Sequence, residues 1–341
     1  MIESALAQLL DGKDLTRAES RRVMDTIMTG GATSAQIGGF LVALRLKGET
    51  PDEIAGAAEA MRDHVIAVHP ERDDLVDTAG TGGDGGRTFN ISTAAALVAA
   101  AAGAGVAKHG NRSISSQSGS ADVLEELGFN LELPADAIAR SIDELGFGFM
   151  FAPAHHPAMG HAAPVRRELA TRTVFNVLGP LTNPAGARSQ VVGVYDAALV
   201  PVIADVLVQL GARRAFVVHG AGGIDELSPA GPNLVCEVAD GEVRRREIDP
   251  LDLGVPRCAP EELRGGTPVE NARRIRAVFA GGGDTAARSA IAINAAGAIA
   301  AAGHADDLRD GLEAAHEALD SGTAATRLEA LAAFSQQKAA T

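Results

Sequence analysis

The sequence contains no tryptophan, one tyrosine (Tyr195) and two cysteines (Cys236 and Cys258) among its 341 residues. Two cysteines are too few for a disulfide framework or a zinc site, so we expect ordinary thiols in a reducing compartment. No apolar run has the length and flanks of a membrane span, and the N-terminus lacks the basic-then-apolar pattern of a signal peptide. These absences predict a cytoplasmic protein with no membrane partner.

The sequence also has no excess of basic residues. Asp and Glu number 44 against 30 Lys and Arg, which gives a formal net charge of −14. Nucleic-acid binding needs a cationic surface, so we expect no nucleic-acid partner, and any cationic pocket must be local. The length and the 46% hydrophobic content allow a large core divided between two domains.

The first seventy residues have the pattern of helices only. Three capping boxes, Thr16-x-x-Glu19, Thr33-x-x-Gln36 and Thr50-Pro51-x-Glu53, each precede apolar residues at helical spacing. We predict a small all-helical N-terminal domain over residues 1–72. Part of 163–184, which is rich in Arg and Pro and lacks a strand pattern, is expected to join it.

Residues 73–341 alternate short apolar runs with longer runs of helical period. This pattern predicts a large α/β domain with a mostly parallel central sheet. The expected strands are 75–78, 105–108, 148–151, 191–195 and 215–219, and the expected helices start near 91, 120, 136, 199, 269, 286 and 323. A β-hairpin with Asp240-Gly241 at its turn is expected over 237–248.

Residues 80–93 read GTGGDGGRTFNIST and lie between a strand pattern and a helix pattern. Such a loop gathers backbone N–H groups at a helix N-terminus, and glycine lets that backbone approach a phosphate closely. The loop lacks the Gly-Lys-Ser/Thr end of a P-loop, and its dinucleotide spacing has no matching acid on the next strand. We interpret it as a diphosphate cradle, with a tight turn that needs positive φ as the alternative.

Polar side chains follow two further strand patterns. The segment 108–116, KHGNRSISS, suits an oligo-anionic ligand with Lys108 as a point charge, and a solvated polar loop is the alternative. Asp225-Glu226 follows another strand in a glycine-rich loop. Adjacent acids suit Mg²⁺, which bridges carboxylates to substrate phosphates, although alone the pair would be interpreted as surface.

Arg166 and Arg167 suit a clamp on a substrate carboxylate, or they form a helix-surface pair. His155, His156 and His161 lie within seven residues, but their spacing matches no common metal site. No nucleophile elbow or Ser-His-Asp arrangement is present. The residues therefore favour binding of a metal-bridged diphosphate over covalent catalysis.

Several motifs together resemble the anthranilate phosphoribosyltransferases, the enzymes of the tryptophan pathway. Besides GTGGDGGRTFNIST and KHGNRSISS they are ADVLEELG at 121–128, FAPAHHPAM at 151–159, RTVFNVLGPLTNPA at 172–185 and GGIDELS at 222–228. The motifs occur in order over nearly the whole chain. The resemblance implies a homodimer that, with Mg²⁺, transfers ribose 5-phosphate from phosphoribosyl pyrophosphate (PRPP) to the amine of anthranilate and releases pyrophosphate.

The resemblance also implies residue roles. The PRPP site would comprise Gly80, Thr81, Gly82, Gly83, Asp84, Thr88, Asn90, Ser92, Thr93, Lys108 and Ser120. The anthranilate site would comprise Gly80, His109, Asn111, Arg166 and Gly179. Ser92, Asp225 and Glu226 would bind Mg²⁺, and the catalytic role would fall to Lys108, Asp225 and Glu226.

Two other functions stay open. A pyrimidine nucleoside phosphorylase-like enzyme would share the fold, although the KHGNR segment and the acidic pair argue against it. A non-catalytic relative that binds nucleic acid is disfavoured by the net charge of −14.

Overall fold

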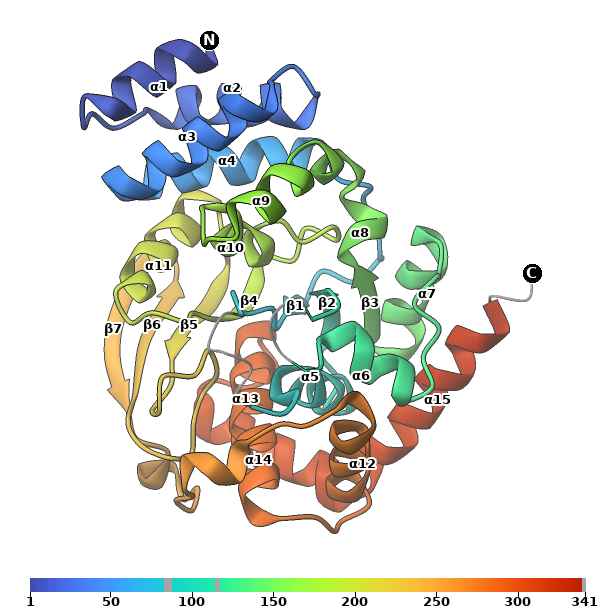
Figure 1. Cartoon of the computed structure of the whole chain (residues 1–341). Helices are drawn as coiled ribbons and strands as arrows, with labels where there is room; N and C mark the ends of the chain where they lie inside the picture. The colour runs from blue at the N-terminus through green and yellow to red at the C-terminus, as the bar shows by residue number, and fades with distance from the viewer. Residues whose placement is uncertain (83–87, 114–116, 339–341) are drawn as a thin grey trace.

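The computed structural model describes residues 1–82, 88–113 and 117–338, and Figure 1 shows a helical N-terminal part beside a larger α/β part. The helical part comprises α1 (Ile2–Leu10), α2 (Arg17–Met28), α3 (Ser34–Lys47) and α4 (Pro51–Asp63). Each of the three expected capping boxes is formed, with Thr16, Thr33 and Thr50 as the capping residues of α2, α3 and α4. The all-helical character of this part is therefore confirmed.

The central sheet has seven strands in the order β3-β2-β1-β4-β5-β6-β7. Their bounds are β1 Leu75–Asp77, β2 Gly105–Gly110, β3 Phe147–Phe151, β4 Ser189–Gly193, β5 Arg214–His219, β6 Asn233–Ala239 and β7 Glu242–Ile248. The first five strands in this order, from β3 through β2, β1 and β4 to β5, pair in parallel. β6 pairs with β5, and β7 with β6, in antiparallel fashion. The mostly parallel sheet is confirmed, with β4 placed two residues earlier than the sequence pattern predicted.

The expected hairpin is formed by β6 and β7 at the edge of the sheet. Its turn residues Asp240 and Gly241 have φ angles of 54° and 76°. A two-residue hairpin turn that matches the strand twist needs positive φ at both positions, and Asp-Gly is a favoured pair for it. β6 begins at Asn233, four residues before the predicted start, so the hairpin is longer than its sequence pattern suggested.

Helices cover both faces of the sheet, because alternate residues of the central strands point to opposite sides. Val191 and Phe216 belong to one core cluster, while Val192 and Val217 belong to another. The large-part helices are α5 (Ile91–Ala101), α6 (Ser120–Glu126), α7 (Ala135–Leu145), α11 (Leu199–Gln209), α12 (Pro268–Phe279), α13 (Thr285–Ala302), α14 (Leu308–Asp320) and α15 (Thr323–Lys338). Seven of these were expected, and α14 was not.

The segment over 152–181 forms short helices, and residues 163–184, for which the sequence showed no strand pattern, contain no strand. They are α8 (Ala152–His155), η1 (Pro157–His161), α9 (Ala163–Leu169), α10 (Phe175–Leu178) and η2 (Gly179–Leu181), and two further 3-10 turns, η3 (Pro250–Leu253) and η4 (Pro260–Leu263), follow the hairpin. Helix α9 contacts α3, and α10 contacts α4. The domain boundary near residue 72 stays a prediction.

Helix α13 is the one described helix that is long and apolar enough to cross a membrane, and 89% of it is buried inside the fold. It packs against α5 and α14 below the sheet (Figure 1). Its apolar composition is therefore explained by its place in the core.

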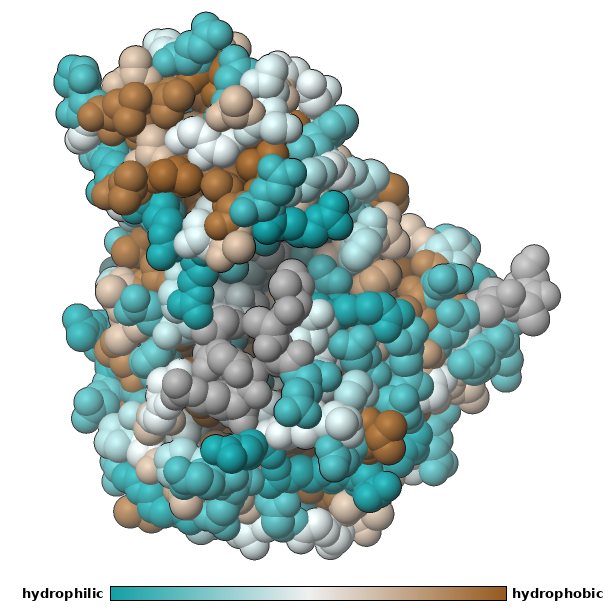
Figure 2. Space-filling model, in the orientation of Figure 1, coloured by the Kyte–Doolittle hydropathy of each residue, from teal (hydrophilic) through white to brown (hydrophobic). Residues whose placement is uncertain are grey.

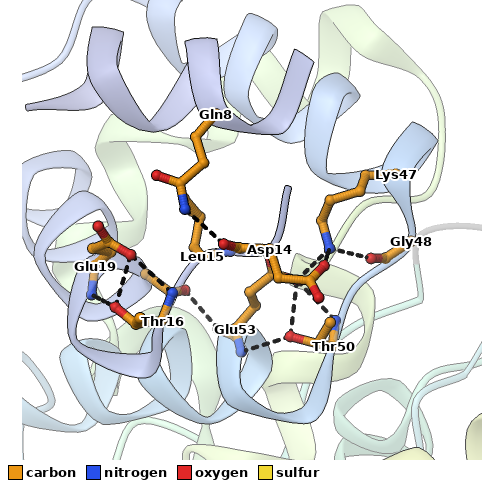
Figure 3. Close-up of polar contacts among 10 residues, drawn as sticks. Gln8, Asp14, Leu15, Thr16, Glu19, Lys47, Gly48, Thr50 and Glu53 are labelled. Atoms are coloured by element: carbon orange, nitrogen blue, oxygen red, sulfur yellow. Dashed lines mark hydrogen bonds and ion pairs between the residues drawn. The ribbon is translucent and has the colours of Figure 1, made fainter. Parts of the chain in front are cut away.

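The helical part is held together at a fully buried carboxylate, that of Glu53 on α4. Its Oε1 accepts the N–H of Leu15 at 2.9 Å, and its Oε2 accepts the N–H of Thr50 at 2.8 Å (Figure 3). The ammonium of Lys47 lies 2.9 Å from Oε2 and also pairs with Asp14 at 2.6 Å. One side chain thus joins the loop before α2, the end of α3 and the start of α4.

We expect Glu53→Ala to lower the free energy of unfolding by about 1–3 kcal/mol, because it leaves the buried N–H group of Leu15 without its acceptor and removes one of the two carboxylates that pair with Lys47. Glu19→Ala is the matched control, since Glu19 holds the same capping-box position in α2 without a buried ion pair. Its effect should be clearly smaller. Urea denaturation followed by circular dichroism measures both variants, and equal losses would contradict the importance of the buried pair.

Candidate active site

The predicted glycine loop begins at the carboxyl end of β1, where the strand order reverses between β2 on one side and β4 on the other. In open α/β sheets, ligands bind at this switch point. The N–H of Thr81 donates to the carbonyl of Gly193 at 2.8 Å, and the hydroxyl of Thr81 accepts the N–H of Tyr195 at 3.2 Å. Two hydrogen bonds therefore join the start of the loop to the end of β4 and the residues just after it.

Asp225 and Glu226 follow β5 and lie against this loop and the helix after it. Oδ2 of Asp225 accepts the N–H of Gly82 at 2.8 Å, and Oε1 of Glu226 accepts the N–H of Ser92 at 2.8 Å in the first turn of α5. The hydroxyl of Thr88 donates to Oε2 of Glu226 at 3.2 Å. The two carboxylates thus occupy N–H groups of the kind that bind phosphate at a helix N-terminus.

Two glycines permit this close approach. A Cβ on Gly193 would lie 1.5 Å from the carbonyl oxygen of Asp225, and one on Gly80 would lie 2.8 Å from its Oδ2. Any side chain at Gly193 would therefore displace the acidic turn. The glycine content of this region reflects packing of backbone on backbone as well as room for a ligand.

Lys108 lies within β2, two residues before its end, and is buried against Thr78, the residue that follows β1. Its ammonium donates to the hydroxyl of Thr78 at 2.9 Å and to the carbonyl of the same residue at 3.3 Å. Burial lowers the pKa of Lys108, while the negative charges of Asp77 and Glu226 oppose that shift. Lys108, the cation predicted for the diphosphate site, is thus buried beside the residues that lead into the glycine loop.

His109 follows Lys108 and faces the segment over 179–183. Its Nδ1 lies 3.2 Å from the carbonyl of Gly179, so this nitrogen carries the proton and Nε2 is the acceptor. Burial, together with the nearby His156, lowers the pKa of His109 to about 3. The rings of His109 and His156 are 5.0 Å apart, and both Nε2 atoms are buried without a partner among the described residues.

Other predicted PRPP and anthranilate residues lie around the N-termini of α5 and α6. The hydroxyl of Ser120 lies 3.2 Å from both the N–H and the carbonyl of Asn111. The side chain of Asn90 bonds the carbonyl of Ser118 at 3.1 Å. Thr93 is buried, and its hydroxyl has no hydrogen bond to a described residue.

Arg166 belongs to a different element from these residues, helix α9. It projects from α9 with its guanidinium 5.0 Å from the ring centre of Phe175, and burial lowers its pKa. It forms no ion pair with any described acidic side chain, and no hydrogen bond or ring contact within the described ranges joins it to His109 or Asn111. The predicted anthranilate residues therefore include one cation that is half-buried and has no counter-charge among the residues that the structure describes.

Gly83 and Asp84, predicted for the PRPP site, lie outside the described residues. Within the described ranges, no cluster of three or more His, Cys, Asp or Glu side chains is able to hold a metal ion. Mg²⁺ needs no such cluster, because it is commonly bound by one or two carboxylates together with substrate phosphates. The hard oxygen atoms of Asp225 and Glu226, beside anion-binding N–H groups, fit that description.

Two polar residues at the site were not among the sequence predictions. The buried carboxylate of Asp77 accepts the N–H of His109 at 3.2 Å and the side-chain amide of Asn183 at 2.7 Å. Burial raises the pKa of Asp77 to about 6. A signal existed for both, since Asp77 ends the strand before the glycine loop and Asn183 belongs to the quoted motif at 172–185.

Family models and known relatives of this chain all point to one family. The family model described as "Glycosyl transferase family, a/b domain" matches residues 72–325, and "Glycosyl transferase family, helical bundle domain" matches residues 3–65. A protein of Anaeromyxobacter dehalogenans named anthranilate phosphoribosyltransferase is 56% identical, with 98% of each chain covered. One of the same name from Moorella thermoacetica is 51% identical, with 100% of each chain covered.

Solved structures agree with this result. Anthranilate phosphoribosyltransferase of Thermus thermophilus superimposes with a TM-score of 0.92 at 46% identity, covering 97% of this chain and 99% of that one. The Saccharomyces cerevisiae enzyme in complex with PRPP and Mg has a TM-score of 0.88 at 28% identity, covering 98% of both chains. The chain belongs to the glycosyl transferase family that the two models describe and, within it, to the anthranilate phosphoribosyltransferases.

Proposed function

We propose that this protein transfers the 5-phosphoribosyl group of PRPP to the amine of anthranilate, giving N-(5-phosphoribosyl)anthranilate and pyrophosphate in tryptophan biosynthesis. The observation that carries the proposal is the acidic turn on the glycine loop and α5, in a chain 56% identical over 98% of its length to a protein named for this reaction. This identity favours phosphoribosyl transfer over the nucleoside phosphorylase-like and nucleic-acid-binding alternatives.

The glycine loop and its neighbours form the donor side of the site in this proposal. The N–H groups of Gly82 and Ser92 would hold pyrophosphate oxygens, and the ammonium of Lys108 would stabilise the charge that develops as pyrophosphate leaves C1′. Asp225 and Glu226 would hold Mg²⁺, and the solved complex of the yeast enzyme with PRPP and Mg supports a metal at a site of this kind. When bound, the metal neutralises charge on the departing pyrophosphate.

The acceptor side needs little acid–base chemistry. The aromatic amine is neutral at pH 7, so no base is needed to create the nucleophile, and alignment with C1′ is the main requirement. His109 is neutral at this pH because burial lowers its pKa to about 3, and its Nε2 is an acceptor without a described partner. We assign this lone pair to the amine of anthranilate, and the half-buried guanidinium of Arg166 to its carboxylate.

Activity and metal dependence are tested together by anthranilate fluorescence. With wild-type protein we expect the signal to change only when PRPP and Mg²⁺ are both present, and no change would refute the proposed function. In Asp225→Ala/Glu226→Ala we expect turnover to fall by at least a hundredfold and its response to Mg²⁺ to weaken, because the cation loses both carboxylates. An unchanged Mg²⁺ dependence in that variant would remove the metal assignment alone.

Arg166→Ala is expected to raise the KM for anthranilate about tenfold or more, and to change the KM for PRPP less than twofold, because only the acceptor carboxylate loses its partner. Arg167→Ala is the matched control from the same helix, where Arg167 is exposed. Steady-state kinetics with each substrate varied in turn measures the split. A rise of equal size in both KM values would contradict the clamp.

We propose further that the protein is a homodimer in the cytoplasm. Figure 2 shows hydrophobic surface over the N-terminal helices, where Leu10 on α1 and Leu46 on α3 are 72% and 81% exposed. Exposed apolar patches of this kind mark protein interfaces. The unpaired thiols of Cys236 and Cys258 support a reducing compartment.

Leu10→Glu/Leu46→Glu should convert the dimer to a monomer, because burying two carboxylates at an apolar interface without partners is unfavourable. Leu251→Glu, a change at an exposed leucine in the large part, serves as the control and should leave the mass unchanged. Sedimentation equilibrium measures the molar mass. A wild-type monomer, or a dimer that survives the double substitution, would exclude this interface.

A further inference from the structure

Asn294 is a buried polar residue in the long apolar helix α13. It lies in α13 between Ile293 and Ala295, and only 4% of it is exposed. A buried amide costs free energy unless its hydrogen bonds are made. The bonds that Asn294 makes therefore indicate why the core tolerates it.

The Asn294 amide holds both backbone groups of a single residue. Its Oδ1 accepts the N–H of Leu227 at 2.9 Å, and its Nδ2 donates to the carbonyl of Leu227 at 2.8 Å. A third bond runs from Nδ2 to the carbonyl of Ala290, one turn earlier in α13, at 2.8 Å. The two bonds to Leu227 fix both the position and the orientation of the backbone there.

Leu227 directly follows the acidic pair, so this clamp acts on the residue next to Glu226. The side chain of Leu227 is fully buried, which adds a second anchor at the same point. Asn294 also lines one small cavity together with Ser92, Asp225 and Glu226. Helix α13 therefore contacts the turn that carries Asp225 and Glu226, whose carboxylates accept the N–H groups of Gly82 and Ser92.

We propose that Asn294 is a positioning residue for Mg²⁺ binding, which fixes the backbone of Leu227 so that Asp225 and Glu226 present their carboxylates at the glycine loop and at the N-terminus of α5. The inference rests on the proposed function, since it requires those two acids to bind the metal–diphosphate. Residues that orient metal ligands commonly change metal affinity 10- to 100-fold when they are replaced.

A purely structural role makes a different prediction. If Asn294 only anchored the turn for folding, its loss would lower stability without a selective effect on metal binding. Asn294→Ser separates the two roles, because a serine hydroxyl can still bond the carbonyl of Ala290 within the helix but is too short to reach Leu227. Asn294→Ala removes all three bonds, and Ser289→Ala is the matched control at a buried polar position of the same helix.

The test is calorimetric titration of each full-length variant with pyrophosphate in the presence of Mg²⁺ and without anthranilate. We expect Asn294→Ser and Asn294→Ala to bind about tenfold more weakly than wild type, and Ser289→Ala to bind within twofold of it. The KM for anthranilate should stay within twofold in all three. Wild-type affinity in a folded Asn294 variant, or failure of both Asn294 variants to fold, would overturn the proposal.

Asp225→Ala/Glu226→Ala in the same titration separates this inference from the proposed function. If that variant loses Mg²⁺-dependent binding while Asn294→Ser keeps it, the acids bind the metal and only the role of Asn294 is wrong. If the acidic variant binds as tightly as wild type, the metal assignment itself is wrong.

Discussion

The site depends on the contact of two carboxylates with the backbone N–H groups of Gly82 and Ser92. This contact joins the turn after β5 to the loop after β1, strands that are separated in the sheet by β4. A helix N-terminus and a glycine loop carry partial positive charge, so they attract an anion whether or not a ligand is bound. Asp225 and Glu226 supply that anion within the chain. The cradle is therefore held in an anion-binding arrangement by the residues proposed to receive the metal.

Two buried residues of opposite charge, Lys108 and Asp77, lie near this contact. Lys108 and Asp77 lie on neighbouring strands. Burial lowers the pKa of Lys108 and raises the pKa of Asp77, and the charge of each residue opposes the shift of the other. Buried ions are costly unless they are paired and hydrogen-bonded, and both of these residues are bonded, to Thr78 and to Asn183 respectively. Removal of either charge would leave the other buried without that nearby opposite charge, which is unfavourable. This argues that the two charges are retained for the geometry of the site.

Local features of the fold were predictable from sequence because short-range chemistry determines them. Capping boxes such as Thr50-Pro51-x-Glu53 place helix starts, and the turn at Asp240-Gly241 requires its positive φ angles. The motifs likewise indicated that the acidic pair follows a strand, whereas Lys108, expected at the end of a strand over 105–108, lies within β2, which continues to Gly110. Sequence periodicity did not reveal α14, or that Asn294 clamps Leu227, because these depend on which segments meet in three dimensions. An isolated asparagine in an apolar helix gives no indication of its partner.

The acceptor side of the site is fixed by a different set of bonds. Three successive carbonyls, of residues 179, 180 and 181, lie within hydrogen-bond distance of the side chains of His109 on β2, Gln190 on β4 and Arg62 on α4. These bonds tie residues 179–181 to two strands and to the helical part, so in the proposed site the segment would be a preformed surface for the aromatic ring. On the donor side, by contrast, the N–H groups at Gly82 and Ser92 already hold carboxylates. If the diphosphate binds where we propose, it would have to replace those carboxylates, whereas anthranilate would not. In the proposed reaction, the donor side would therefore adjust to the acceptor side. Asp225 and Glu226 would hold Mg²⁺ once the phosphates took their place at Gly82 and Ser92, and the ion would supply positive charge that offsets the charge of the phosphates.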